Sequence, residues 1–198
     1  LVANNRAMIR AVATATGLSG SIHVHDFAAS NETRVAMHRP ISTGGETRDL
    51  PVAAECLKGR CTERVEVTTL DAFVEAAGLR HVYHLAIDTE GHDALVLEGA
   101  TRLLRESRVA ILEFEVNFVG YWTTKRRNPH YRDRRLLKPV VARLERFGYA
   151  CFWQTTAGLV PLSGPCWRPE YDRERKWSNV LCAHEPPVIG ALLGLSRA

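Results

Sequence analysis

Acidic residues follow two apolar segments in the middle of the chain, where their carboxylates could accept protons or hold a cation. Val82–Ile87 is a short apolar run of the kind found in strands that are buried on both faces, and Asp88 and Glu90 come after it. Glu113 and Glu115 stand at the end of the second apolar run. Carboxylates at such positions can act as general bases or as oxygen ligands for hard cations.

The segment between the two apolar runs has the period of a helix. Its apolar residues fall on one helical face: Val96, Ala100, Leu103 and Leu104. Gly99 within this segment predicts a kink or a division into two short helices. A strand, a crossover helix and a second strand at 109–115 form a βαβ unit, whose strands are parallel. Because ligands bind beyond the carboxyl ends of parallel strands, all four carboxylates are expected at one edge of a sheet.

Further helices and strands are predicted on both sides of this unit. Helices should begin near Asn4, at Thr69 and near Leu136, and each is followed by a glycine that can end it. Strands are predicted at Ser21–His25, Val35–His38, Arg64–Val67, Tyr149–Gln154 and Ser178–Ala183. The second and third of these strands are expected to pair antiparallel at a sheet margin. The alternation of helices and strands indicates an α/β fold with an open sheet.

Length and composition fit a single domain. A chain of 198 residues that is 45% hydrophobic is long enough for one core, expected over residues 1–184 with a peripheral tail at 185–198. The net charge of +4 is modest and the basic residues concentrate in Lys125–Arg135, so nucleic-acid binding is not indicated. We interpret that basic segment as a solvated loop, with a site for an anionic substrate as the alternative. No apolar run approaches the roughly 18 residues of a membrane span, and the compartment is left unassigned.

The five cysteines do not have the spacing of a zinc site, because no C-x-x-C pair occurs. Cys151 and Cys182 lie in apolar strand-like runs, where a buried thiol behaves as a small hydrophobic group. Cys56 and Cys61 could close a short loop in an oxidising compartment. We therefore expect no metal bound by cysteine, and free buried thiols at positions 151 and 182.

Several short motifs occur together in one order along the chain. They are Thr68-Thr69-Leu70-Asp71, Ile87-Asp88-Thr89-Glu90-Gly91, Leu97-Glu98-Gly99-Ala100 and Ile111-Leu112-Glu113. In this order and spacing they resemble the core of the FkbM family of S-adenosylmethionine-dependent methyltransferases, although Ala86 and Asp93 replace the family's usual lysine and second glutamate. The cysteine-containing last two strands are similar too, so the resemblance extends from Leu1 to about His184.

The resemblance implies a Rossmann-like methyltransferase sheet, mostly parallel with an antiparallel carboxyl-terminal strand. The strands at 149–154 and 178–183 would then pair antiparallel beyond the strand at 109–115. In that fold a glycine-rich loop and an acidic residue on the first two strands hold the cofactor. Those strands would precede Leu1, so we expect them to be missing and this chain alone to be inactive. The strands at 21–25 and 82–87 would be separated by the place of the two absent strands.

The resemblance also implies roles for single residues. The residues implied are Asp88 and Glu90 in catalysis, Asp26, Phe27 and Ala28 in binding S-adenosylmethionine, and His92, Glu115 and Tyr121 in binding the acceptor. Asp26 could accept a hydrogen bond from the adenine amino group while Phe27 or Ala28 packs on the ring. Asp26–Asn31 is expected to form the turn that ends the strand at 21–25, and an ordinary turn without a role in binding is the alternative. No metal ligand is implied.

Three functions follow from these observations. The first is methyl transfer from S-adenosylmethionine to a hydroxyl of a small molecule or glycan, with a carboxylate to take the hydroxyl proton. The second is a Mg²⁺ or Ca²⁺ site, whose ligands would be Asp88, Glu90, His92 and Asp93. That spacing fits neither an EF-hand loop nor an aspartyl phosphatase. The third is a domain of this fold that binds or organises other molecules without catalysis. We favour the first.

Overall fold

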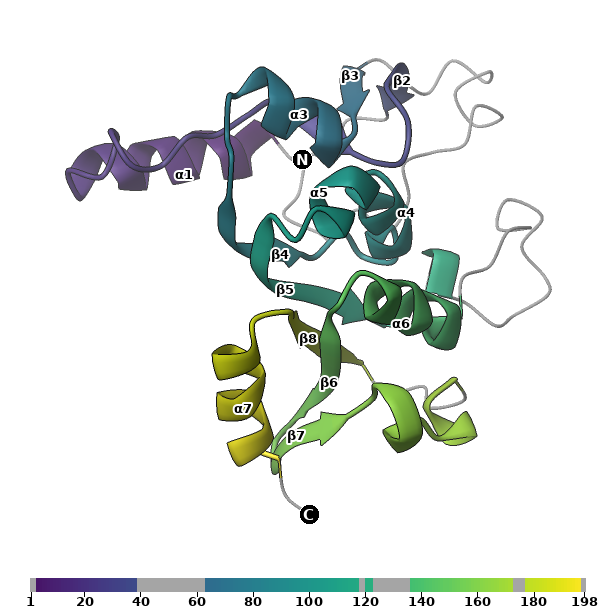
Figure 1. Cartoon of the computed structure of the whole chain (residues 1–198). Helices are drawn as coiled ribbons and strands as arrows, with labels where there is room; N and C mark the ends of the chain where they lie inside the picture. The colour runs from purple at the N-terminus through teal and green to yellow at the C-terminus, as the bar shows by residue number, and fades with distance from the viewer. Residues whose placement is uncertain (1–2, 39–62, 118–119, 123–135, 173–176, 197–198) are drawn as a thin grey trace.

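The computed structural model describes residues 3–38, 63–117, 120–122, 136–172 and 177–196, and their strands form two sheets (Figure 1). The amino-terminal elements are α1 (Ala3–Ala15), β1 (Phe27–Ala29), β2 (Arg34–His38), β3 (Glu63–Thr68) and α3 (Leu70–Ala76). The central elements are β4 (Val82–Ile87), α4 (Asp93–Glu98), α5 (Thr101–Arg105), β5 (Val109–Val116) and the 3₁₀ turn η2 (Gly120–Trp122). The carboxyl-terminal elements are α6 (Leu137–Arg146), β6 (Ala150–Thr155), β7 (Gly158–Pro161), η4 (Gly164–Cys166), η5 (Pro169–Asp172), β8 (Ser178–Ala183) and α7 (Pro186–Gly194).

Both sheets mix parallel and antiparallel strands. In the smaller sheet, β3 pairs parallel with β1 and antiparallel with β2. The larger sheet has the order β4-β5-β8-β6-β7, in which only β4 and β5 are parallel. The α/β class is confirmed. The mostly parallel sheet that we predicted is not, because β8 and the β6–β7 hairpin pair antiparallel beyond β5 and because β1 belongs to the other sheet.

Most predicted elements form close to their expected bounds. β4 and β8 have the predicted limits, and the antiparallel pairing of β6 and β8 beyond β5 is confirmed. β2 and β3 form the predicted antiparallel pair. Thr69 caps α3, as expected, since its hydroxyl accepts a hydrogen bond from the amide of Ala72 at 3.1 Å. The short-range pattern of the sequence is therefore a good guide to these elements.

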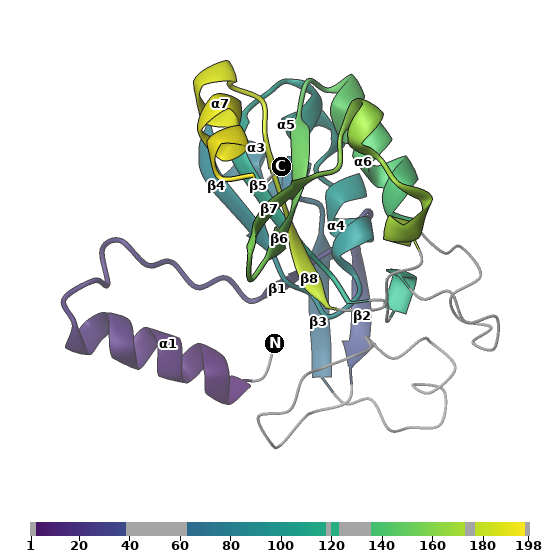
Figure 2. The same cartoon turned by 90° about the horizontal axis from the view of Figure 1, so that it is seen from below.

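The strand predicted at Ser21–His25 is wrong. Regular pairing begins later, at β1, within the segment for which we predicted a turn. The backbone carbonyl of Val24 accepts a hydrogen bond from Arg10 Nη2 at 3.1 Å, and the adjacent Asp26 carboxylate pairs with Arg6 and Arg10. Because side chains of α1 bond these groups, the segment is held without a neighbouring strand. α1 itself lies to one side of both sheets (Figure 2).

Cys151 and Cys182 form a disulfide between β6 and β8, which corrects the prediction of free thiols. The two residues are direct partners in the antiparallel register, with Cα atoms 4.1 Å apart, and both are fully buried. They are 31 residues apart in the sequence, so the register of the sheet is what brings them together. Cys56, Cys61 and the basic segment Lys125–Arg135 lie outside the described residues.

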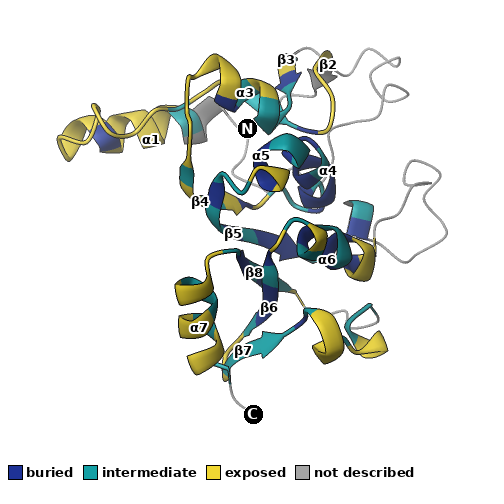
Figure 3. Ribbon diagram, viewed as in Figure 1, coloured by how far each residue is buried: buried dark blue, intermediate teal, exposed yellow. Residues whose placement is uncertain are grey.

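Helices cover the larger sheet on both sides. α4, α5 and α6 pack on one face, and α7 lies on the opposite side next to β7 (Figure 2). The core lies between the larger sheet and the helices α4, α5 and α6 (Figure 3). Its fully buried residues include Leu97, Leu104, Leu112, Phe114 and Leu144.

No described helix has the length and apolar character needed to cross a membrane. The predicted domain limit at residue 184 stays a prediction.

β4 is less buried than predicted. Its apolar run indicated a strand covered on both faces, but Tyr83 is 79% exposed, and His84 and Ala86 are exposed as well. Leu85 and Ile87 pack with the core. The reason is position, because β4 is at the edge of the larger sheet and β5 is its one partner among the described strands. An apolar sequence alone does not distinguish an edge strand from a central one.

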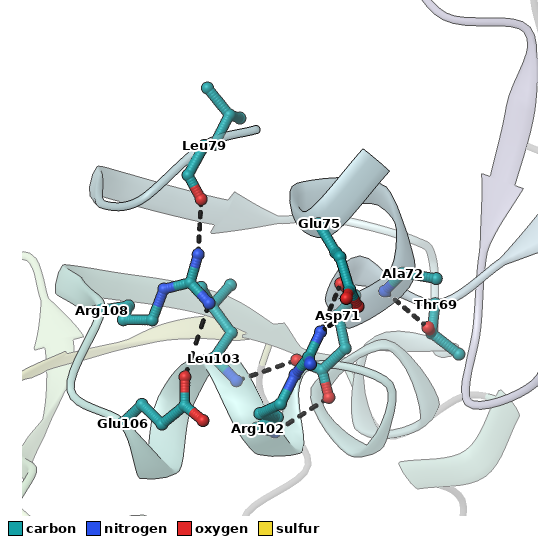
Figure 4. Close-up of polar contacts among 9 residues, drawn as sticks. All are labelled: Thr69, Asp71, Ala72, Glu75, Leu79, Arg102, Leu103, Glu106 and Arg108. Carbon is teal, nitrogen blue, oxygen red and sulfur yellow. Dashed lines mark hydrogen bonds and ion pairs between the residues drawn. The ribbon is translucent and has the colours of Figure 1, made fainter. Parts of the chain in front are cut away.

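Asp71 connects α3 to the crossover between β4 and β5 (Figure 4). Its carboxylate accepts hydrogen bonds from the backbone amides of Arg102 (2.9 Å) and Leu103 (2.8 Å), which begin α5. The Arg102 side chain in turn donates to Glu75 on α3 at 2.6 Å. Amides in the first turn of a helix have no partner within the helix, so the Asp71 carboxylate stabilises the start of α5.

Gly99 separates α4 from α5, which confirms the predicted division into two short helices. A Cβ at this position would lie 2.0 Å from the backbone oxygen of Ser30, which follows β1. The Asn31 side chain donates to Glu98 at 3.0 Å in the same place. The absence of a side chain at Gly99 therefore allows the smaller sheet to approach the helices that cover the larger one.

We predict that Gly99→Ala destabilises the fold, because its Cβ would displace the carbonyl of Ser30. Overpacking of this kind costs about 1–3 kcal/mol of unfolding free energy, which urea titration can measure. Gly190→Ala in α7 is the matched control, since a Cβ there meets nothing within 4 Å. That control should be neutral or stabilising by up to about 1 kcal/mol. Equal effects at both positions would contradict the close approach at Gly99.

Candidate active site

The turn after β4 is held by the carboxylate of Asp93, the first residue of α4. Asp93 is fully buried, and its oxygens accept hydrogen bonds from the backbone amides of Thr89 (3.3 Å) and Gly91 (3.2 Å). Burial raises the pKa of Asp93 above its ordinary value, and these amide bonds oppose the rise. Glu90 and Gly91 have positive φ angles of 52° and 96°. The turn therefore fixes Asp88 and Glu90 at the carboxyl end of β4.

Three carboxylates meet where β4 and β5 end. One oxygen of each of Asp88, Glu90 and Glu115 lies within 4.8 Å of the others, and we call these three residues the carboxylate cluster. Glu115 is 3% exposed, and its Oε2 accepts a hydrogen bond from Asn117 Nδ2 at 2.6 Å. The same Asn117 nitrogen lies 3.4 Å from Glu90 Oε2. The parallel pairing of β4 and β5 thus brings three of the four predicted carboxylates to one edge.

Glu113 does not join the carboxylate cluster. Asn179 Nδ2 on β8 donates to its Oε1 at 2.7 Å, and His84 Nε2 on β4 lies 3.4 Å from its Oε2. Alternation puts Glu113 and Glu115 on the same face of β5, but residues two apart in a strand are separated by about 6.6 Å. The Glu113 carboxylate therefore contacts side chains of the two neighbouring strands, β4 and β8, and lies two residues before Glu115 on β5.

Glu115 is the member of the carboxylate cluster whose acidity is most perturbed. Its pKa is raised from 4.5 to about 7, first because it is buried and then because the charges of Asp88, Glu90 and Asp93 lie nearby. The nearby Trp177 side chain acts in the opposite direction and lowers the pKa of Glu115. Near neutral pH the cluster can therefore retain a proton at Glu115.

The carboxylate cluster also suits a positively charged ligand. Asp88 is exposed and makes no hydrogen bond or ion pair with the described residues. Oxygens at this spacing could bind a divalent cation such as Mg²⁺, or face the cationic end of a small molecule. Two of the metal ligands considered from the sequence, His92 and Asp93, are not in the group, and Asp93 holds the turn instead.

His92 and Tyr121 lie together beside the turn. Their rings are 5.3 Å apart and meet edge to face at 72°. The backbone amide of Tyr121 donates to the carbonyl of Gly91 at 2.8 Å, which attaches η2 to the turn. With Glu115, the three residues expected to bind the acceptor therefore surround one turn. Their roles in binding stay predictions.

Asp26, Phe27 and Ala28 lie in a different environment. The Asp26 carboxylate is paired with Arg6 at 2.9 Å and with Arg10 at 3.2 Å. Phe27 and Ala28 are in β1, where the Phe27 ring packs 5.1 Å from that of Phe73. Within the described chain no hydrogen bond, ion pair or ring contact joins these three residues to the carboxylate cluster. Their predicted role in cofactor binding stays a prediction.

Two side chains next to the carboxylate cluster are absent from the sequence-based set of site residues. Asn117 follows Glu115 by two positions, so the alternation of an extended strand could have placed both side chains on one face. Trp177 gives no such signal. It comes to this edge because β8 pairs antiparallel with β5 and aligns Asn179 with Glu115. The pairing of β5 with β8, which are far apart in the sequence, cannot be predicted from local sequence pattern and is seen only in the structure.

We predict that the charge of Glu115 destabilises the folded state at neutral pH. The pKa of about 7 in the folded state exceeds the value near 4.5 in the unfolded chain, so the penalty is absent below 4.5 and grows as the pH rises to 7. Glu115→Gln removes the charge and can still accept a hydrogen bond from Asn117. It should raise the free energy of unfolding at about pH 8, by on the order of 2 kcal/mol, and change it little near pH 4.5.

Urea unfolding of the wild type and the variant across this pH range measures the difference between them. Glu170→Gln, at an exposed position in η5, is the matched control. The difference between its free energy of unfolding and that of the wild type should be the same at every pH. A stability difference between Glu115→Gln and wild type that is the same at every pH would contradict the argument from burial.

One of three comparisons with known proteins found a match. A family model described as the methyltransferase FkbM domain matches residues 12–151, which include the whole carboxylate cluster. Searches of curated proteins and of solved structures found no match. Because the family model covers more than half of the chain and includes the turn after β4 and the end of β5, this chain belongs to the FkbM methyltransferase family.

Proposed function

We propose that the carboxylate cluster is part of an O-methylation site for a hydroxyl of a small molecule or glycan. The observation that supports this most is the meeting of Asp88, Glu90 and Glu115 within 4.8 Å, at the carboxyl ends of two parallel strands. Ligands of α/β sheets bind beyond such strand ends. A hydroxyl acceptor needs a base, and this cluster supplies carboxylates at that place in a chain of a methyltransferase family.

The methyl donor that we propose is S-adenosylmethionine, the usual donor of methyltransferases. When bound, it supplies a methyl group whose bond to the sulfonium sulfur breaks, with the electron pair staying on sulfur, as the acceptor oxygen bonds the methyl carbon. The donor set of the cluster fits such a group, because three carboxylates concentrate negative charge. Asp88 and Glu90 would face the cationic end. Phe27 and Ala28 stay our candidates for the adenine ring, whereas the Asp26 carboxylate already pairs with two arginines.

Asp88 is the residue that we propose as the base. Its carboxylate is exposed and makes no described hydrogen bond or ion pair, so its oxygens can take the proton of an acceptor hydroxyl. A role for Asp88 in capping α4 has no support, because the turn is held by Asp93. Glu90 would orient the acceptor from the turn. Glu115, being buried, would hold Asn117 and set the charge of the cluster.

We predict that Asp88→Asn lowers methyl transfer by about a hundredfold or more, the usual scale for the loss of a positioned base. Folding should be unchanged, since the side chain keeps its size and no described bond is lost. The measurement is transfer of a labelled methyl group from S-adenosylmethionine by the full-length protein, with thermal unfolding as the check on folding. Asp172→Asn in η5 is the matched control and should keep full activity. Turnover of Asp88→Asn close to that of the wild type would refute the assignment.

A cation-dependent reaction is the second candidate function, and the spacing of the carboxylate cluster favours it. In that case a chelator should abolish activity, and added Mg²⁺ or Ca²⁺ should restore it. For metal-independent methyl transfer we expect no effect of the chelator. The two candidates are therefore separated by one experiment on the full-length wild-type protein.

A further inference from the structure

Asn117 lies between two members of the carboxylate cluster. It comes directly after β5 and is half-buried. Its side-chain nitrogen, Nδ2, is 2.6 Å from Glu115 Oε2 and 3.4 Å from Glu90 Oε2. The second contact is longer than a usual hydrogen bond, so the bond to Glu115 is the stronger of the two. One uncharged side chain therefore joins the end of β5 to the turn after β4.

The orientation of this amide follows from the groups around it. An ionised carboxylate only accepts hydrogen bonds, whereas an asparagine side chain has an NH₂ group that donates and an oxygen that accepts. Two carboxylate oxygens on one side therefore attract the NH₂ group. Its hydrogens carry partial positive charge, and they offset part of the repulsion between Glu90 and Glu115. Asn117 thus acts on the two glutamates as a bound cation would.

The nitrogen of Asn117 also lies where a bridging cation would bind. Ca²⁺ lies about 2.3–2.6 Å from its carboxylate oxygens. A cation that joined Oε2 of Glu115 to Oε2 of Glu90 would meet the NH₂ group of Asn117, which already contacts both oxygens. The partial positive charge on the amide hydrogens would repel that cation. The amide and a cation therefore compete for one place.

We propose that Asn117 is a positioning residue that occupies the place of a cation between Glu90 and Glu115, so that the site transfers a methyl group without a metal ion. The proposal rests on the function proposed above. The amide contacts two of the three carboxylates and leaves Asp88 for the acceptor. The acceptor oxygen bonds the methyl carbon, the carbon–sulfur bond breaks with its electron pair staying on sulfur, and the hydroxyl proton passes to Asp88.

Cation binding tests this role without an assay of activity. The probe is Ca²⁺, titrated by calorimetry at about pH 8 into the full-length wild type, Asn117→Ala and Asn117→Asp. Asn117→Ala removes the amide that competes with the cation, so the dissociation constant should fall about threefold or more. Asn117→Asp replaces the donor with a fourth carboxylate and should lower it about tenfold or more.

Asn31→Asp is the matched control for the change of charge. Asn31 also donates to a glutamate, Glu98, at 3.0 Å, but this exposed pair lies outside the carboxylate cluster. Ca²⁺ binding by the control should therefore equal that of the wild type. Thermal unfolding checks that each variant folds, and Asn117→Asp decides the question if Asn117→Ala does not.

The direction of the change in Asn117→Ala is the decisive result. If the amide oxygen were a ligand for the cation, this variant would bind Ca²⁺ more weakly than the wild type. Weaker or unchanged binding in Asn117→Ala, no tighter binding in Asn117→Asp, or equal tightening in Asn31→Asp would overturn the proposal.

Activity provides the separate test of the function on which the proposal rests. Transfer of a labelled methyl group to a mixture of sugars and phenols by the full-length wild type should be unaffected by a chelator. Asn117→Ala should be slower by about tenfold or more, because Glu90 and Glu115 lose their shared donor. Methyl transfer that requires Mg²⁺ would overturn the role of Asn117 while supporting the methyltransferase. Tighter Ca²⁺ binding in both variants without any methyl transfer would instead support the role of Asn117 and refute the proposed function.

Discussion

The position of the candidate site depends on one buried carboxylate. Asp93 is fully buried, and its charge is stabilised by the amides of the turn that leads into α4. A buried charge without such bonds would cost several kcal/mol, so the turn and the carboxylate require each other. The turn has a glutamate with positive φ and places Glu90 and Asp88 against the end of β5. The negative charges there repel one another, and the fold tolerates the repulsion because the strands are held by a large apolar core.

The sequence was sufficient for the elements that depend on local pattern. The limits of β4 and β8, the cap at Thr69 and the helix break at Gly99 all follow from residues close to one another in the chain. The convergence of Asp88 and Glu90 with Glu115 was predictable for a related reason, since a βαβ unit has only one plausible arrangement of its strands.

Features that depend on contacts between residues far apart in the sequence could not be predicted from local sequence pattern. The exposure of β4 follows from its place at a sheet edge, which its composition does not encode. Ser21–His25 has strand-like residues, yet arginines of α1 bond its backbone and the residue after it. Trp177 reaches the site, and Cys151 reaches Cys182, because of how β8 is aligned between its neighbours. In each case the deciding contact joins residues at least ten positions apart.

The disulfide between β6 and β8 has a topological consequence. Together with the backbone it closes a covalent ring that contains β7, η4, η5 and Trp177. A cut of the chain in the connection between β6 and β8 would leave the two pieces joined as one molecule by the disulfide. The strand that presents Asn179 to Glu113 would then be retained by the sulfur bridge in addition to its hydrogen bonds. β6 and β8 are therefore joined both by the hydrogen bonds of strand pairing and by the disulfide.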